Sequence, residues 1–306
     1  EFADALSKRP VGGLIFFSSN IVDPVQTSEM LEKIQNYARE DEGLPLFLAI
    51  DEEGGKVSRL AKNSAFNLRN IGSMSKIRNV KEAYAAGNYI GKYLSDYGFN
   101  LDFAPDADVL SASANKVIGD RSFGSNPQTV SEYAKAYSDG LHSNGILSTF
   151  KHYPGHGGTI EDSHKDYAYS DKSYEELLKS DLIPFINAND YGVDCIMVAH
   201  VSLPNIIGDD TPCSLSPVMV QGELRDKFSY KGLIITDALN MGAISKHYSA
   251  GEAAKLAFIA GSDLLLMPSD IDSAYNEILK AVNSGEISEE RINESLRRIL
   301  TVKENL

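Results

Sequence analysis

Short apolar runs alternate with longer amphipathic segments along the chain. Seven mainly apolar runs are typical of β-strands, at residues 14–17, 46–50, 101–104, 146–150, 195–201, 233–235 and 264–267. Segments with apolar positions at helical spacing follow them, at residues 26–37, 80–97, 127–142, 174–188, 251–260, 269–283 and 288–305. Continuously apolar strands separated by helices are typical of a parallel sheet that helices cover on both faces. We therefore expect an α/β protein.

Two arrangements of such a sheet are open, a doubly wound sheet and a (β/α)8 barrel of the TIM type. The glycine fingerprint of dinucleotide-binding doubly wound folds is missing, and Gly12 and Gly13 precede a strand instead of following one. Polar residues stand at or after the carboxyl ends of different strands, namely Asp51, Asp106, Lys151, His152, His200, Asp237 and Ser269. In a barrel these ends converge on one mouth, where active sites lie. We favour the barrel, with its first strand missing or irregular at the N-terminus.

No linker, low-complexity tract or change in composition divides the chain. Its 306 residues exceed the usual size of one domain, but (β/α)8 barrels of about 250 residues or more are common. We therefore expect residues 1–306 to form a single domain. No run approaches the roughly 18 consecutive apolar residues of a membrane span, so we expect none.

Charge narrows the classes of partner. The chain has 29 Lys and Arg residues against 43 Asp and Glu residues, a formal net charge of −14. This excess argues against nucleic acid and against an anionic membrane surface, both of which attract basic proteins. Cys195 and Cys213 are too few for a disulfide scaffold, although a single bridge between them stays open. The oligomeric state cannot be inferred from these features.

The segment from Lys151 to His164 holds three of the six histidines. A metal site is one interpretation, because His152 and His156 have the i, i+4 spacing that places two ligands on one helix face. The proline and glycines between and beside them disfavour a helix, so proton transfer fits better. Asp162 could fix the tautomer of His164 and raise its pKa, which suits a general acid and base. An Asp capping the loop beside an exposed histidine explains the same spacing.

Asp237 ends an apolar strand, and no other charged residue lies within five positions of it. A carboxylate at a buried strand end is costly unless it is paired or used, but an Asp that N-caps the next helix is equally open. Asp51 and Arg59 lie on either side of a glycine pair, and Arg121 lies between two glycines. Asp51 and Arg59 could bind a polar ligand at the mouth, or they could form surface charge pairs. Arg121 could bind a ligand, or it could bridge loops.

Taken together, these segments resemble glycoside hydrolase family 3, and specifically its β-N-acetylglucosaminidase branch, the NagZ-like enzymes. The hallmark of that branch is Lys-His-x-Pro-Gly-His-Gly, then Thr, then Asp-Ser-His, and it is intact from Lys151 to His164. Other family landmarks appear in order at residues 11–13, 50–55, 103–105, 117–124 and 235–239. The resemblance runs from about residue 11 to the end of the chain.

The resemblance implies a (β/α)8 barrel that removes terminal non-reducing β-linked N-acetylglucosamine from a small carbohydrate with retention of configuration. It implies no metal or organic cofactor. Asp237 matches the nucleophile that forms a covalent glycosyl-enzyme, and His164 matches the acid and base, with Asp162 orienting and charging it. The positions that match the family's sugar-binding residues are Asp51, Arg59, Arg121, Lys151 and His152.

Two alternatives remain, a β-glucosidase-type exo-glycosidase of the same family and a catalytically silent sugar-binding relative. The physiological glycan could be a cell-wall muropeptide or a chitin oligomer. Little of the first strand and helix usual in the family is present, and no second domain follows Leu306, so we expect loops of the barrel alone to complete the site. Residues 235–244 resemble exported members slightly more than cytoplasmic ones, which favours a secreted or cell-envelope location.

Overall fold

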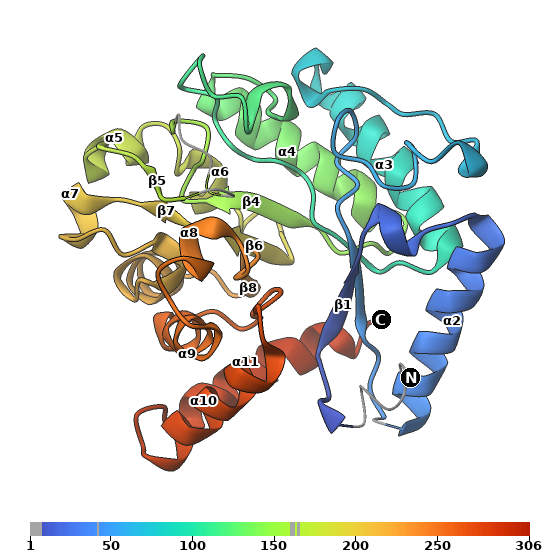
Figure 1. Ribbon diagram of the computed structural model, residues 1–306. Coiled ribbons are helices and arrows are strands. Elements are labelled where there is room, and N and C mark those ends of the chain that lie inside the picture. The colour runs from blue at the N-terminus through green and yellow to red at the C-terminus, as the bar shows by residue number, and fades with distance from the viewer. Residues whose placement is uncertain (1–7, 42, 160–162, 164–165) are drawn as a thin grey trace.

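Parallel strands form the centre of the molecule, and helices surround them (Figure 1). The computed structural model describes residues 8–41, 43–159, 163 and 166–306. Six strands of these residues make up two parallel sheets: β1 (Gly13–Phe16), β2 (Phe47–Ile50), β3 (Leu101–Asp102), β4 (Thr149–Tyr153), β6 (Cys195–Val198) and β8 (Leu233–Thr236). Their order is β1-β2-β3 in one sheet and β4-β6-β8 in the other.

Single parallel bridges extend these two sheets. Asp106 pairs with Lys151, so the segment after β3 runs beside β4. Ile235 pairs with Leu264, which places the start of the strand predicted at residues 264–267 next to β8. The order of neighbours therefore continues from β1 through β8 to Leu264, in the sequence order that alternating strands and helices predict.

Six of the seven predicted strands occur near their expected positions, and the seventh is represented by the bridge at Leu264. The strand predicted at 195–201 was too long. The strand β6 ends at Val198. Residues Val201–Ser202 form a separate strand, β7, which pairs with β5 (Ala168–Tyr169) in a two-stranded sheet. The parallel α/β arrangement is as expected. An eighth strand before β1 would fall on residues 1–7, which lie outside the described residues.

Six of the seven predicted helical segments form helices near their expected positions. Apart from short 3-10 helices, the described helices are α2 (Pro24–Asp41), α3 (Val80–Tyr97), α4 (Pro127–His142), α5 (Tyr174–Leu178), α6 (Ile183–Ile186), α7 (Pro204–Ile207), α8 (Gly242–Ser245), α9 (Ala250–Ala260), α10 (Ile271–Asn283), α11 (Glu289–Lys303) and the π-helix η6 (Val218–Lys227). The single helix predicted at 174–188 was wrong, because α5 and α6 are separate. Pro184 lies in the first turn of α6, where its missing N–H is tolerated, whereas inside a continuous helix it would remove a hydrogen bond.

Alternate residues of the strands pack on opposite sides of the sheets. Phe47 and Ala49 of β2 belong to one buried cluster, and the residues that alternate with them belong to another. The first cluster also contains side chains of β3, β6 and β8, so the sheets curve around it. Leu264 packs against the same cluster, and a Cβ built on Gly12 would lie 3.8 Å from its side chain. The last strand position therefore comes close to the start of β1.

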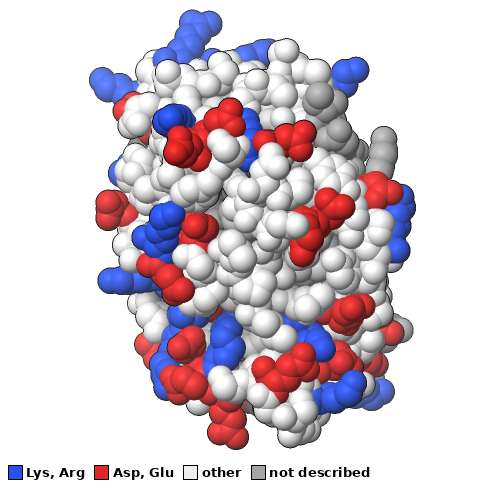
Figure 2. Space-filling view, turned by 90° about the vertical axis from the view of Figure 1, so that its left-hand side faces the viewer, with Lys and Arg blue, Asp and Glu red and all other residues white. Residues whose placement is uncertain are grey.

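Three further features bear on the sequence-based expectations. Cys195 and Cys213 are buried and free, so they do not form the bridge that the sequence left open. Among the described helices, none has the length and apolar character needed to cross a membrane. On the face shown in Figure 2, acidic and basic side chains are interspersed, so the net negative charge is not gathered into one patch on that face.

Candidate active site

The carboxylate of Asp51 lies between two cations from different parts of the chain. Asp51 follows β2, Lys151 belongs to β4, and Arg59 lies in the loop after β2. Lys151 Nζ donates to Oδ1 of Asp51 at 2.9 Å, and Arg59 Nη2 donates to Oδ2 at 3.1 Å. The side chains of Asp51 and Arg59 are 17% and 25% exposed, so a ligand can reach both. Three of the predicted sugar-binding residues are therefore in direct contact.

Glu53 joins the remaining predicted residues to this group. Arg121 forms two parallel hydrogen bonds with Glu53, from Nε to Oε2 at 2.8 Å and from Nη2 to Oε1 at 2.7 Å. Lys151 Nζ lies 2.7 Å from the same Oε1. The Nη2 atom of Arg121 is also 3.4 Å from Nε2 of His152. All five predicted sugar-binding residues thus belong to one network, which we call the cation–carboxylate network: Asp51, Glu53, Arg59, Arg121, Lys151 and His152.

The charges in this network hold one another in the ionised state. Burial alone would raise the pKa of Glu53, but the charges of Arg121 and Lys151 outweigh it and lower that pKa. Burial alone would lower the pKa of Lys151, but Asp51 and Glu53 outweigh it and raise that pKa. Glu53 and Lys151 are therefore charged at neutral pH, and their ion pairs hold them in place before a ligand arrives. Such groups can donate to and accept from the hydroxyls of a polar ligand.

A second buried carboxylate, Asp108, holds His152 and His156, two of the three histidines of the Lys151–His164 segment. Its Oδ2 lies 2.7 Å from Nδ1 of His152 and accepts from the backbone N–H of His152 at 3.2 Å, while its Oδ1 accepts from the N–H of His156 at 2.5 Å. Burial alone would raise the pKa of Asp108, but His152 outweighs it and lowers that pKa. The ring nitrogens of His156 face the hydroxyls of Thr159 and Ser163, at 2.8 Å and 2.9 Å.

Sequence reasoning missed Glu53 and Asp108, although a signal for both was present. Glu53 lies two residues after Asp51, and Asp108 lies two residues after Asp106, each pair just beyond a strand. In an extended chain, side chains two positions apart point to the same side. A second carboxylate at that spacing was therefore placed to reach the same groups as the first.

The predicted acid–base residues Asp162 and His164 lie outside the described residues, but their neighbours are described. Ser163, between them in the sequence, is buried and hydrogen-bonded to His156. The side chain of Asn115 donates to the backbone carbonyls of His156 and Thr159, at 2.7 Å and 2.9 Å. The chain is therefore anchored at Thr159, three residues before Asp162, and at Ser163 inside the pair.

Asp237 lies at the end of β8 and contacts the chain that surrounds it. Its N–H donates to the carbonyl of Val198 at 2.8 Å, and its Oδ1 accepts from the N–H of Ala238 at 2.8 Å. The next described helix is α8, and its N-cap is Met241, so Asp237 does not cap it. The alternative role as a helix cap is thereby corrected. Asp237 as a whole residue is half-buried.

A hydrogen bond and an electrostatic effect show that the Asp237 segment lies next to the histidine-rich segment. The N–H of Ala243 donates to the carbonyl of Ser163 at 3.2 Å. Burial lowers the pKa of His156, and this is opposed by Asp108 and, more weakly, by Asp237, so the charge of Asp237 acts on that ring. The residue between Asp162 and His164 thus contacts the chain that follows Asp237.

The donor atoms of Asp106, Asp108 and His152 lie within 4.8 Å of one another, close enough for one metal ion. However, Asp108 is already bonded to His152, and Arg121 Nε lies 3.4 Å from Oδ2 of Asp106. A guanidinium at this distance opposes a second cation. Burial, and then the charge of Asp108, raise the pKa of Asp106 well above its usual range, and a metal ligand has to be deprotonated. We therefore assign no metal ligands here. The earlier metal interpretation required a helix through His152, which lies in strand β4 instead.

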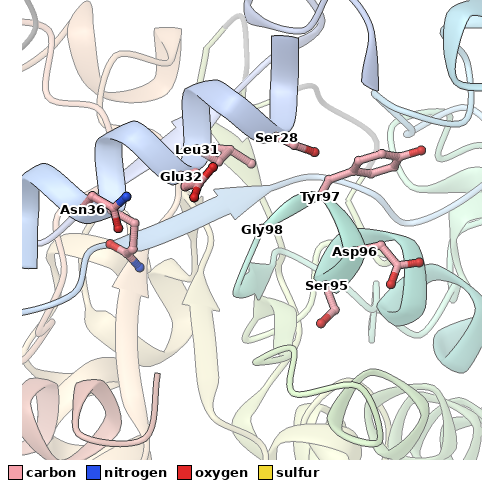
Figure 3. A pocket seen from close by; sticks show the side chains of 9 residues that line it. Ser28, Leu31, Glu32, Asn36, Ser95, Asp96, Tyr97 and Gly98 are labelled. Atoms are coloured by element: carbon pink, nitrogen blue, oxygen red, sulfur yellow. The ribbon is translucent and has the colours of Figure 1, made fainter. Parts of the chain in front are cut away.

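A groove of about 370 Å³ between α2 and α3 lies on other elements than this site (Figure 3). Its lining includes Glu32 and Asn36 of α2, and Asp96 and Tyr97 of α3. None of the predicted site residues lines it. We therefore do not assign the groove to the candidate active site.

The sequence that carries this strand-end site was compared with known protein families. A model of the Glycosyl hydrolase family 3 N terminal domain matches residues 1–302. The chain belongs to this family. The resemblance inferred from the motifs between residues 11 and 239 is therefore confirmed.

Several glycosyl hydrolase family 3 relatives carry hexosaminidase names. Beta-hexosaminidase A of Pseudoalteromonas piscicida is 32% identical over 100% of this chain and 55% of that protein. A beta-hexosaminidase of Tolumonas auensis is 36% identical over 87% of this chain and 78% of that protein. A solved glycoside hydrolase family 3 beta-N-acetylglucosaminidase from Paenibacillus superposes with a TM-score of 0.94 at 36% identity, covering 99% of this chain and 58% of that chain. The chain thus spans little more than half the length of the first and third of these relatives.

Proposed function

We propose that this family 3 chain is the catalytic unit of a retaining exo-β-N-acetylglucosaminidase. It removes terminal β-linked N-acetylglucosamine from the non-reducing end of a glycan. One contact carries this proposal: the N–H of Ala243, six residues after Asp237, donates to the carbonyl of Ser163, between Asp162 and His164. This contact supports a common site for the proposed nucleophile and the proposed acid. The hexosaminidase names of the relatives support the same activity.

In the first half-reaction, a carboxylate oxygen of Asp237 bonds to the anomeric carbon and the glycosidic bond breaks. The proton of His164 goes to the leaving oxygen, so the aglycone departs as an alcohol. In the second half-reaction, His164 takes a proton from water, and the water oxygen displaces Asp237 from the anomeric carbon. Two inversions give overall retention. Asp162 orients the imidazole and stabilises its charged form.

The cation–carboxylate network binds the sugar. Arg59, Arg121 and Lys151 donate to sugar hydroxyls and to the acetamido carbonyl, His152 adds a further polar contact, and Asp51 accepts from hydroxyls. Because these groups are paired with one another before the sugar arrives, little reorganisation is needed on binding. Nucleophile, acid and base are all side chains, so the reaction uses no cofactor.

The closure of the strands into a complete barrel is part of the same proposal. The strands close into a single (β/α)8-type barrel domain between Leu264 and the start of β1. The inner cluster of side chains from β2, β3, β6 and β8 supports this closure, as does the approach of Gly12 to Leu264. A closed ring brings the carboxyl ends of all its strands to one mouth.

The substrate is proposed to be a cell-wall muropeptide fragment or a chitin oligomer, at a secreted or cell-envelope location. A muropeptide differs from chitin in the residue that follows the cleaved bond. Product analysis on an N-acetylglucosaminyl-anhydromuramic substrate beside chitobiose therefore separates the two. Faster release from the first favours a role in peptidoglycan turnover.

The activity is tested by comparing the wild type with Asp237→Ala on an aryl N-acetyl-β-glucosaminide. We expect the variant to lose about a thousandfold or more in kcat, because it lacks the nucleophile. The exposed Asp190→Asn variant should keep wild-type activity. Equal background release from the wild type and Asp237→Ala would instead indicate a silent sugar-binding relative. Comparable efficiency on an aryl β-glucoside would favour the β-glucosidase-type alternative.

A further inference from the structure

One buried histidine contacts the Asp237 segment without a part in the proposed chemistry. His200 follows β6 and is 0% exposed. Its Nδ1 lies 2.7 Å from the hydroxyl of Ser214, and its Nε2 lies 3.0 Å from the backbone carbonyl of Ala238. We infer that His200 is a positioning residue that holds the proposed nucleophile Asp237 in place through Ala238. The inference rests on the proposed function, because the orientation of Asp237 matters for catalysis only if Asp237 is the nucleophile.

The partners of His200 determine where its proton lies. A backbone carbonyl can only accept, so Nε2 carries the hydrogen and donates it to Ala238. In the neutral ring Nδ1 is then an acceptor, and the hydroxyl of Ser214 donates to it. Because both ring nitrogens are engaged, the ring plane is fixed relative to the turn after β8.

Strand β6 and the residues after it hold the Asp237 turn at two points. Before the nucleophile's side chain, the carbonyl of Val198 accepts from the N–H of Asp237 at 2.8 Å. After it, His200 donates to the carbonyl of Ala238, which also accepts from the N–H of Met241 at 3.0 Å. The fixed Ala238 in turn donates its N–H to Oδ1 of Asp237 at 2.8 Å. The path from His200 to the carboxylate therefore consists of one residue of backbone and two hydrogen bonds.

This arrangement predicts an effect on bond formation and not on sugar binding. Nucleophilic attack requires a carboxylate oxygen aligned with the anomeric carbon at about 3–3.5 Å, and a misplacement of about 1 Å can cost about a hundredfold in rate. The sugar itself is held by the cation–carboxylate network, which includes Asp51 and Lys151 and does not include His200. Loss of the bond to Ala238 should therefore slow formation of the glycosyl-enzyme and leave affinity for the free sugar nearly unchanged.

The test measures covalent labelling by 5-fluoro-N-acetylglucosaminyl fluoride, followed by mass spectrometry of the peptide that contains Asp237. For His200→Phe, which keeps a buried ring but has no N–H, we expect the maximal labelling rate to fall about a hundredfold. The inhibition constant for N-acetylglucosamine should change by less than about threefold. His200→Gln keeps a donor at a similar distance and should recover at least about tenfold of the lost rate.

Controls separate positioning from folding and from the proposed function. Ser214→Ala removes only the hydroxyl that orients Nδ1, and we expect a loss of about tenfold in the labelling rate. It provides the comparison even where His200→Phe does not fold. If Ser214→Ala and every His200 variant that folds are labelled at the wild-type rate, the inference is wrong. The proposed function still stands in that case. Equal losses in the folded Gln and Phe variants also overturn the inference. Label on a wild-type residue other than Asp237 overturns both.

Discussion

The ammonium group of Lys151 lies 2.7 Å from the carboxylate of Glu53, a side chain that is 1% exposed. Arg121 reaches the same oxygen, also at 2.7 Å. Glu53 is therefore the shared counter-ion of two residues that we expect to bind sugar. Its own exposure is too small for it to be a main contact of the ligand, so its effect on catalysis should act through Lys151 and Arg121.

We expect Glu53→Gln to lower kcat/KM on an aryl N-acetyl-β-glucosaminide by about a hundredfold. The amide cannot balance two buried cations, and removing one partner of a buried pair costs about 3 kcal/mol or more in the free energy of unfolding. Both quantities should fall together, as measured by steady-state kinetics and urea unfolding.

Glu132→Gln is a matched control on the exposed surface of α4 and should change neither quantity appreciably. Wild-type kinetics in Glu53→Gln would show that Lys151 and Arg121 keep their positions without this carboxylate. Such a result would contradict the role of Glu53 as the counter-ion that holds Lys151 and Arg121 in place.

Asp108→Asn should also impair both stability and activity. The two oxygens of Asp108 accept from the N–H of His152, the N–H of His156 and the ring of His152. An amide replaces one oxygen by a donor, which then faces another donor. We expect a loss of about 2 kcal/mol in the free energy of unfolding and a drop of about tenfold or more in kcat/KM. An Asp108→Asn variant with the wild-type melting temperature would disprove this.

The pH dependence of stability should reflect His142 at the end of α4. Its Nε2 lies 2.6 Å from Asp194. Burial lowers the pKa of His142, but the hydrogen bond and charge of Asp194 outweigh it, so the pKa rises above its usual 6.5. The folded state then binds this proton more tightly than the unfolded state. Its contribution is complete below about pH 6.5 and is lost as the pH rises through the folded pKa.

His142→Gln should therefore lower the free energy of unfolding more at about pH 5.5 than at about pH 8.5. The difference should be about 1 kcal/mol, because the histidine is partly exposed and water screens the pair. Urea unfolding at both pH values measures it. An equal loss at the two values would mean that the proton does not contribute.

Much of the fold could be predicted because buried strands and amphipathic helices leave clear periodicities in the sequence. The helices at 80–97 and 127–142 occur with those bounds, since Asn79 and Asn126 cap them through their side chains. The π-helix at Val218–Lys227 was not predicted. Its hydrogen-bonding pattern depends on packing against neighbouring elements and has no simple periodic signature.

The site was only partly predictable. The motif positions named the residues that we propose to bind sugar, but Glu53 and Asp108 bond mainly to other site residues. Their roles depend on which strand ends become neighbours, as when Asp106 pairs with Lys151 across the sheets. His200 was noted at a strand end, but its bond to Ala238 depends on the turn after β8 and not on sequence spacing.

The role of His164 as the proposed acid and base can be tested by how the rate depends on the leaving group. His164→Ala and Asp162→Ala should both slow hydrolysis of a substrate with a poor leaving group by about a hundredfold or more. An activated aryl leaving group departs without protonation, so it should recover a large part of the loss in the glycosylation step. Rates for a series of aryl N-acetyl-β-glucosaminides measure this dependence, with the exposed Asp190→Asn variant as a control. If the loss is the same for good and poor leaving groups, the proton comes from another group and His164 is not the acid.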